Sequence, residues 1–226
     1  MRCDFATWLP IGANFSQGGM APIRGFIPHV QVGDGSLHDF FDNPARQASA
    51  HFWISKTGTL EQYVDTDDKA WAEAAGNPYF ISCEFEGQVD EPMTSQQLDM
   101  GGRLIAWVYG NVGQFPLVVN QSPDGNGITP HFAGGAAWGN HSCPGPLRFQ
   151  QYDELILAAL RYMPDAQPQE DEVDQGYLDA IVETRDNVRK LAAASGTAEA
   201  VKSLTDADLA AIAKAVNDET ARRQQA

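Results

Sequence analysis

The chain has 226 residues, 43% of them hydrophobic and 10% aromatic, a composition that can bury a core and excludes a disordered polymer. Its formal net charge of −15 disfavours binding to nucleic acid and adsorption to anionic lipid, because both require clustered Lys and Arg side chains. Its 3 cysteines are too few for a disulfide framework and fit synthesis in a reducing compartment.

Strand patterns recur in the first half of the chain. Short runs rich in apolar residues predict single strands, and a Lys-Thr-Gly turn between two such runs predicts a hairpin. The predicted single strands cover residues 25–33, 79–87 and 115–120, and the predicted hairpin covers residues 49–65.

Two helices are predicted between and after these strands. In residues 94–110, Thr94 and Gln97 form a capping box, whereas Gly101–Gly102 weakens the helix unless a neighbour packs closely there. Residues 146–163 predict a helix with a proline near its start. Strands and helices mixed in this order predict an α/β (α+β) domain over residues 1–163, with a central mixed β-sheet flanked by helices.

The composition changes after this domain. Residues 164–174 are acidic, contain proline and lack aromatics, which is typical of a linker. Residues 175–226 predict two helices, each with an apolar stripe too narrow for it to fold alone. Three interpretations stay open for this tail: a solvated helical appendage, a homo-oligomerising coiled coil and a cell-wall targeting module.

Two of the predicted strands carry polar residues that invite a functional reading. The two-residue period places His29 on the less apolar face of its strand. In residues 79–87 the same period places Glu84 and Glu86 on a polar face and Cys83 on an apolar one. His29, Glu84 and Glu86 are each either an ordinary structural residue or part of a cleft lining, and the strand alone does not decide between these; Cys83 is expected to be a packed thiol.

The segment from His131 to Gly145 carries two histidines and a cysteine around a glycine-rich loop. Imidazole and thiolate are favoured zinc ligands, so His131 and Cys143, joined by His29, would leave a fourth position open, as in catalytic zinc sites. The competing interpretation makes Cys143 a nucleophile with His131 or His141 as its base, in a Cys/His peptidase.

Three segments taken together resemble one family, the zinc-dependent N-acetylmuramoyl-L-alanine amidases of the peptidoglycan-recognition (amidase type 2) kind, which include many phage endolysins. The segments are SAHFWISKTGTLEQYVD, AWAEAAGNPYFISCEFEG and the closing PH followed by HSCPG. Their order and spacing over roughly residues 25–160 carry the resemblance.

The resemblance implies a peptidoglycan-recognition-protein-like fold with a zinc ion in a groove on one face of the sheet. It implies that His29, His131 and Cys143 bind this one catalytic Zn²⁺ and that Glu84 is the catalytic carboxylate. His141 falls where many members place Lys or Arg, and is the candidate oxyanion donor. The candidate substrate-binding residues on the groove wall are Trp71, Asn77 and Trp138, with core packing an equal alternative for each tryptophan.

This chain departs from the family pattern at three positions. Ala50 stands where some members have a catalytic tyrosine, Ala72 where members often have a histidine, and His141 where many have a basic residue. These departures put rate and substrate detail in question, and leave the metal ligands intact.

The function predicted from the sequence is cleavage of the bond between N-acetylmuramic acid and L-alanine in bacterial peptidoglycan. The alternatives are a non-catalytic peptidoglycan-binding module on the same fold and the Cys/His cell-wall peptidase. We expect no signal peptide, no membrane insertion and no nucleic-acid partner. Together with the resemblance this predicts an endolysin made in the host cytoplasm that reaches the wall after holin-type release.

Overall fold

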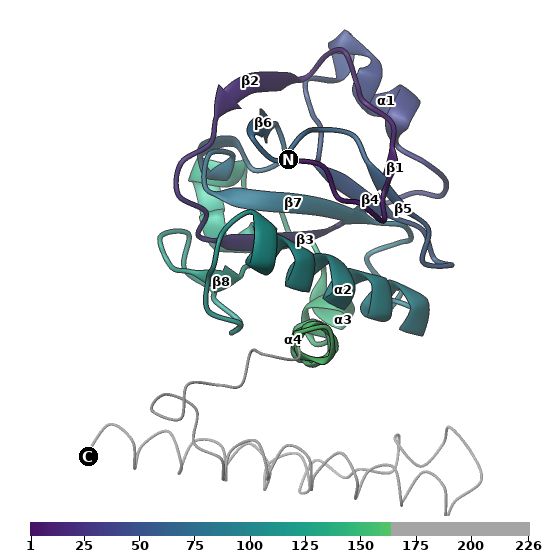
Figure 1. Cartoon of the computed structure of the whole chain (residues 1–226), viewed down its shortest axis with the longest axis vertical. Coiled ribbons are helices and arrows are strands. Elements are labelled where there is room, and N and C mark those ends of the chain that lie inside the picture. The colour runs from purple at the N-terminus through teal and green to yellow at the C-terminus, as the bar shows by residue number, and fades with distance from the viewer. Residues whose placement is uncertain (164–226) are drawn as a thin grey trace, which may run out of the picture. The chain divides into compact units, whose positions relative to one another are not determined.

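A six-stranded mixed sheet forms the centre of residues 1–163, the part of the chain that the computed structural model describes (Figure 1). Only β4 and β5 pair in antiparallel fashion within it; the other neighbours are parallel. In spatial order the strands are β1 (Thr7–Trp8), β5 (Leu60–Gln62), β4 (Phe52–Ile54), β7 (Phe80–Phe85), β3 (Gly25–Val30) and β8 (Gly127–Ile128). A separate two-stranded sheet pairs β2 (Phe15–Gly19) with β6 (Asp68–Ala70).

The predicted α+β architecture is confirmed, because helices cover this sheet. The helices α2 (Ser95–Asn111) and α4 (Tyr152–Arg161) lie on one side of it, and α1 (His38–Asp42) and the small sheet lie on the other (Figure 1). The predicted linker at 164–174 and the two tail helices at 175–226 lie outside the described residues and stay predictions. None of the helices in residues 1–163 is long and apolar enough to cross a bilayer.

The main hydrophobic core lies between the sheet and these two helices. The apolar face of β7 contributes Ile81, Cys83 and Phe85, all 0% exposed, to a cluster that also contains residues of α2 and α4. Glu84 lies on the opposite face of the same strand, as the two-residue period predicts. The core thus fixes which face of β7 is left for polar residues.

The start of α2 has the predicted capping box. The Thr94 side chain accepts a hydrogen bond from the backbone N–H of Gln97, and the Gln97 side chain accepts one from the backbone N–H of Thr94. As expected for a glycine pair inside a helix, Gly101 and Gly102 have neighbours so close that a side chain would not fit. A Cβ at Gly101 would lie 2.8 Å from the Leu155 side chain, and one at Gly102 would lie 2.6 Å from the Ala158 carbonyl carbon.

Two predicted elements are wrong in detail. Residues 115–120 do not form a strand: within them only Val119 pairs, in an isolated bridge to Ile128, and Pro116 has no N–H to donate. The predicted helix at 146–163 is broken into α3 (Pro146–Phe149) and α4. The break is at Gln151. Its side-chain oxygen accepts a hydrogen bond from the backbone N–H of Met93, and its side-chain N–H donates to the Met93 carbonyl.

His51 lies fully buried under the polar face of the sheet. Its Nδ1 accepts from the backbone N–H of Ser82 at 3.1 Å, and its Nε2–H donates to the Asp68 carbonyl at 3.1 Å. Burial lowers the pKa of His51 to about 4, although the Asp68 carbonyl opposes this shift. The ring is therefore neutral in the folded chain at all but acidic pH.

Close packing of α2 on α4 predicts opposite effects on the free energy of unfolding when two glycines of α2 are replaced by alanine. Gly102→Ala adds a methyl against Ala158 and should lower the free energy of unfolding by about 1–2 kcal/mol, because overpacking outweighs better helix propensity. Gly110→Ala, with nothing within 4 Å of the added methyl, should raise it by up to about 1 kcal/mol. Urea unfolding of both variants checks this; equal effects of the two would contradict the packing.

The buried neutral state of His51 predicts a pH-dependent contribution to stability. The unfolded chain takes up a proton near pH 6.5 and the folded chain only near pH 4, so this contribution is present above pH 6.5 and is lost on going down to pH 4. Its upper limit is about 3 kcal/mol. In His51→Gln the free energy of unfolding should therefore fall less over this range than in the wild type.

The comparison variant is His38→Gln: the hydrogen bond with Asp39 raises the pKa of His38, so the free energy of unfolding should fall more in this variant than in the wild type over the same range. Urea unfolding is repeated at several pH values, and the difference between chains is the readout because the other acidic groups titrate in all of them. Identical slopes for the wild type and His51→Gln would show that His51 contributes nothing to acid sensitivity.

Candidate metal centre

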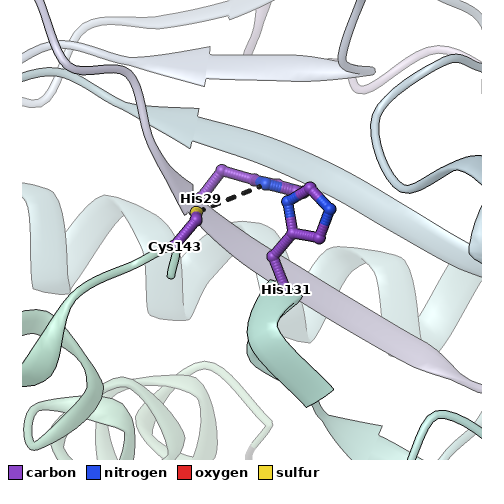
Figure 2. A group of neighbouring side chains, drawn as sticks. All are labelled: His29, His131 and Cys143. Carbon is purple, nitrogen blue, oxygen red and sulfur yellow. Dashed lines mark hydrogen bonds between the residues drawn. The ribbon is translucent and has the colours of Figure 1, made fainter. Parts of the chain in front are cut away.

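Three potential metal ligands meet beside strand β3. His29 lies on β3, His131 begins the 3-10 helix His131–Trp138, and Cys143 follows this helix in a loop (Figure 2). One donor atom from each residue lies within 4.8 Å of the others, and the Cys143 Sγ is 3.6 Å from the His29 Nδ1. The structure thus brings together the three residues that the sequence singled out as ligands.

The tautomer of His131 follows from its own hydrogen bond. Its Nε2 lies 2.9 Å from the carbonyl oxygen of Trp138, which can only accept, so Nε2 carries the proton. The Nδ1 atom therefore keeps its lone pair free for a metal. Burial, helped by the positive charge of His29, lowers the pKa of His131 to about 3, so that the ring stays neutral.

Hydrogen bonds within the loop bring Cys143 back to the sheet. Its Sγ accepts from the backbone N–H of Val30 at 3.3 Å, and its carbonyl accepts from the N–H of Phe132 at 3.1 Å. The turn in between uses positive φ angles at Gly135 (48°) and Gly139 (87°), which L-residues with side chains rarely adopt. The two ends of the loop therefore lie close together, and the two glycines allow the turns that bring them there.

Glu84 lies next to His29 because β3 and β7 pair in parallel, with His29 opposite Glu84. The carboxylate is partly exposed, and its Oε2 is buried with no hydrogen-bond partner in residues 1–163. Burial raises the pKa of Glu84, and the positive charges of His29 and Arg148 oppose this. Such a carboxylate can exchange a proton with a group in the cavity.

Glu86, expected on the same polar face, has a different role. It follows the end of β7, and its carboxylate accepts from the backbone N–H of Gly35 at 2.6 Å and that of Lys56 at 2.6 Å. It thus holds two loops together and does not line the cavity.

The sequence prediction missed one buried carboxylate at this site. Glu73 is 1% exposed, and its Oε2 lies 3.7 Å from the Nε2 of His29, on the ring edge away from Cys143. Burial raises the pKa of Glu73, and the neighbouring His29 opposes the shift. The available signal was a lone glutamate in the otherwise apolar run Ala72–Gly76.

A cavity of about 650 Å³ borders the three potential ligands and Glu84. It also borders the remaining predicted residues, Trp71, Asn77, Trp138 and His141. His141 is exposed and stacks on the ring of His131, with centroids 4.3 Å apart and planes at 23°. Trp71 is half-buried, and its indole N–H donates to the Ser16 hydroxyl at 3.0 Å.

Packing already accounts for two of these wall residues. Trp138 is 3% exposed and contacts Phe80 edge to face at 5.4 Å between centroids. The Asn77 side-chain oxygen accepts from the backbone N–H groups of Ala72 at 3.0 Å and Glu73 at 2.6 Å. Contact of either residue with a substrate stays a prediction.

The donor set fits a zinc ion. One thiolate and two imidazoles are ligands that zinc prefers, and bonds of about 2.0–2.3 Å in a tetrahedron put donor atoms about 3.3–3.8 Å apart. The 3.6 Å between Cys143 Sγ and His29 Nδ1 lies in this range. The hydrogen bond from His131 Nε2 to a backbone carbonyl is also typical of a ligand histidine.

Solved structures of low sequence identity share this fold. A Staphylococcus aureus hydrolase, AmiA, aligns with a TM-score of 0.55 at 15% identity, over 72% of this chain and 85% of that chain. The endolysine N-acetylmuramoyl-L-alanine amidase LysCS from Clostridium intestinale aligns with a TM-score of 0.52 at 14% identity, over 67% and 95%. A mutant endolysin from Bacillus subtilis gives 0.52 at 19%, over 68% and 97%.

Sequence comparison points the same way. The 1,6-anhydro-N-acetylmuramyl-L-alanine amidase AmpD of Haemophilus influenzae is 28% identical in an alignment of 92 residues, covering 31% of this chain and 50% of that protein. The chain thus spans about half the length of this curated relative. The family model described as N-acetylmuramoyl-L-alanine amidase (Amidase_2) matches residues 19–146, more than half of the 226 residues. The chain therefore belongs to the N-acetylmuramoyl-L-alanine amidase family.

Proposed function

We propose that this chain hydrolyses the amide bond between N-acetylmuramic acid and the L-alanine of the peptidoglycan stem peptide, using one zinc ion bound by His29, His131 and Cys143. The observation that carries the proposal is the meeting of these three donors with Glu84 at a single cavity in a member of this family. A non-catalytic binding module would have no need of a complete donor set beside an unpaired carboxylate.

The residues around the cavity divide the chemistry between them. A bound zinc ion supplies a water of lowered pKa and polarises the amide carbonyl. Glu84 takes the proton from the attacking water and passes it to the leaving amine, a task for which its raised pKa suits it. His141, exposed at the cavity beside His131, donates a hydrogen bond to the oxygen that becomes negative.

The proposed biological role is that of a phage endolysin. The chain would be made in the host cytoplasm, reach the wall after holin-type release and degrade it, causing host lysis. Shared fold with two endolysins supports this role, and the net charge of −15 does not hinder binding to an uncharged glycan. The relative AmpD supports instead a recycling enzyme that acts on soluble 1,6-anhydro fragments.

A substrate comparison tests the activity and separates these two roles. The full chain, loaded with zinc, is given either intact peptidoglycan sacculi or soluble 1,6-anhydro-muropeptides, and the products are analysed by mass spectrometry. An endolysin should release stem peptides from sacculi at a rate at least comparable to that on the soluble fragments. Cleavage of the soluble fragments alone would contradict the endolysin role, and cleavage of neither would contradict the amidase activity.

The one rival chemistry with a specific observation behind it uses Cys143 as a nucleophile. The base expected from the sequence was His131 or His141, but the Sγ lies 3.6 Å from the imidazole Nδ1 of His29, a thiol–imidazole pair of the kind that cysteine hydrolases use. The two chemistries differ in which side chains can take the place of Cys143. Aspartate can bind zinc, but it cannot replace an attacking thiolate in a cysteine peptidase.

Replacement of Cys143 therefore decides between ligand and nucleophile. Cys143→Asp should keep bound zinc and lose at most roughly 10–100-fold in activity, whereas Cys143→Ala should lose both zinc and activity. A nucleophilic cysteine would instead lose about 10⁴-fold or more in both variants. Zinc content and hydrolysis of cell walls are measured on the same samples. The control is wild type treated with a chelator, which should be inactive until zinc is added back.

A further inference from the structure

We propose that Glu73 is a positioning residue for the metal centre, whose carboxylate accepts a hydrogen bond from His29 Nε2–H and so directs His29 Nδ1 at the zinc ion. This inference rests on the zinc site of the proposed function. It adds a residue that touches neither the metal nor the substrate and acts through His29.

The two nitrogens of His29 face two different partners. Its Nδ1 lies 3.6 Å from the sulfur of Cys143, and its Nε2 lies 3.7 Å from the Oε2 of Glu73. The ring is therefore placed between a ligand on one edge and a carboxylate on the other. A carboxylate on the far nitrogen fixes the tautomer and orientation of a ligand histidine and raises the basicity of the nitrogen that binds the metal.

Both atoms of this contact lack any other partner. His29 Nε2 and Glu73 Oε2 are buried and make no hydrogen bond within residues 1–163 at their present separation. Buried polar atoms without partners are uncommon and costly. A shift of less than about 1 Å joins the two in a hydrogen bond of ordinary length and satisfies both at once.

The local backbone holds Glu73 in this place. The Asn77 side-chain oxygen accepts from the N–H of Glu73, and the Glu73 carbonyl accepts from the N–H of Gly76 at 2.9 Å. Gly76 lets this turn lie against Trp138, since a Cβ there would be 2.7 Å from the indole. Trp138 in turn supplies the carbonyl that accepts from His131 Nε2. The partners of the two histidine ligands are thus packed against each other.

Charge balance favours the same role. A zinc ion with one thiolate and two neutral imidazoles keeps one positive charge in excess, in a region where charges are poorly solvated. Glu73, 1% exposed, has no Lys or Arg within 4.0 Å in residues 1–163, so the metal centre is the cation that offsets its charge.

Zinc affinity of Glu73 variants tests the inference without relying on activity. In the full chain, Glu73→Leu should bind zinc about 10–100-fold more weakly than wild type in competition with a chelator. Glu73→Gln keeps an oxygen that can accept from His29 and should recover part of this loss. Glu84→Gln is the matched control: it removes the carboxylate that lies opposite His29 in the strand pair and should abolish hydrolysis with zinc affinity within a few-fold of wild type.

Melting temperatures of the metal-free and zinc-loaded proteins complete the test. Because Glu73 is also the buried neighbour of His29 without metal, each variant is compared with its own metal-free form, and the rise on zinc addition should be smaller in Glu73→Leu than in wild type. Unchanged zinc affinity in Glu73→Leu, or a lowered metal-free melting temperature with an unchanged rise, would overturn the role of Glu73. Failure of the wild type itself to bind zinc would overturn the metal centre of the proposed function.

Discussion

Parallel pairing of β3 with β7 is the constraint on which the candidate site depends. The pairing sets His29 opposite Glu84, and because side chains alternate, both point to the face that the core leaves free. The apolar residues of β7 fix this choice, since a slip of one residue would turn Glu84 into the core and Cys83 out of it. Packing that involves neither functional residue therefore decides where both of them lie.

The end of this strand pair is held by a buried cation. Arg148 is 1% exposed, and its guanidinium donates to the carbonyls of Phe85, Glu86, Gln88 and Glu91. The N–H groups of Arg148 thus donate to backbone carbonyls, and its charge interacts with Glu84 and Cys143 only electrostatically, without a hydrogen bond. Arg148 thus fixes the C-terminal end of β7 through backbone carbonyls.

The sequence predicted those parts of the site whose signal is periodic or local. Alternation in 25–33 and 79–87 placed His29 and Glu84 on the polar face, and the Thr94–Gln97 box marked the start of α2. These features follow from neighbouring residues alone. The resemblance to a family supplied the ligand set, which spacing alone supported only weakly.

The features that the sequence did not predict depend on distant contacts. The strands β1 and β8, of 2 residues each, are too short to show a period, and they are defined by the partners they meet. A helix break at Gln151 depends on Met93, which lies 58 residues earlier. The carbonyl of Trp138 has no sequence signal at all, because every residue has a carbonyl group.

Two carboxylates lie near His29, and their different exposure matches the two tasks proposed for them. Glu84 lies on a strand and borders the cavity, so a substrate or water can exchange a proton with it directly. Glu73 lies on a turn, is closed off from solvent and does not border the cavity, so it affects a reaction only through the ring of His29. A carboxylate that transfers protons must be reachable, whereas one that orients a ligand is most effective where water cannot compete for its hydrogen bond. In the proposed mechanism, acid–base chemistry and ligand orientation are thus separated, because one carboxylate borders the cavity and the other is buried beside His29.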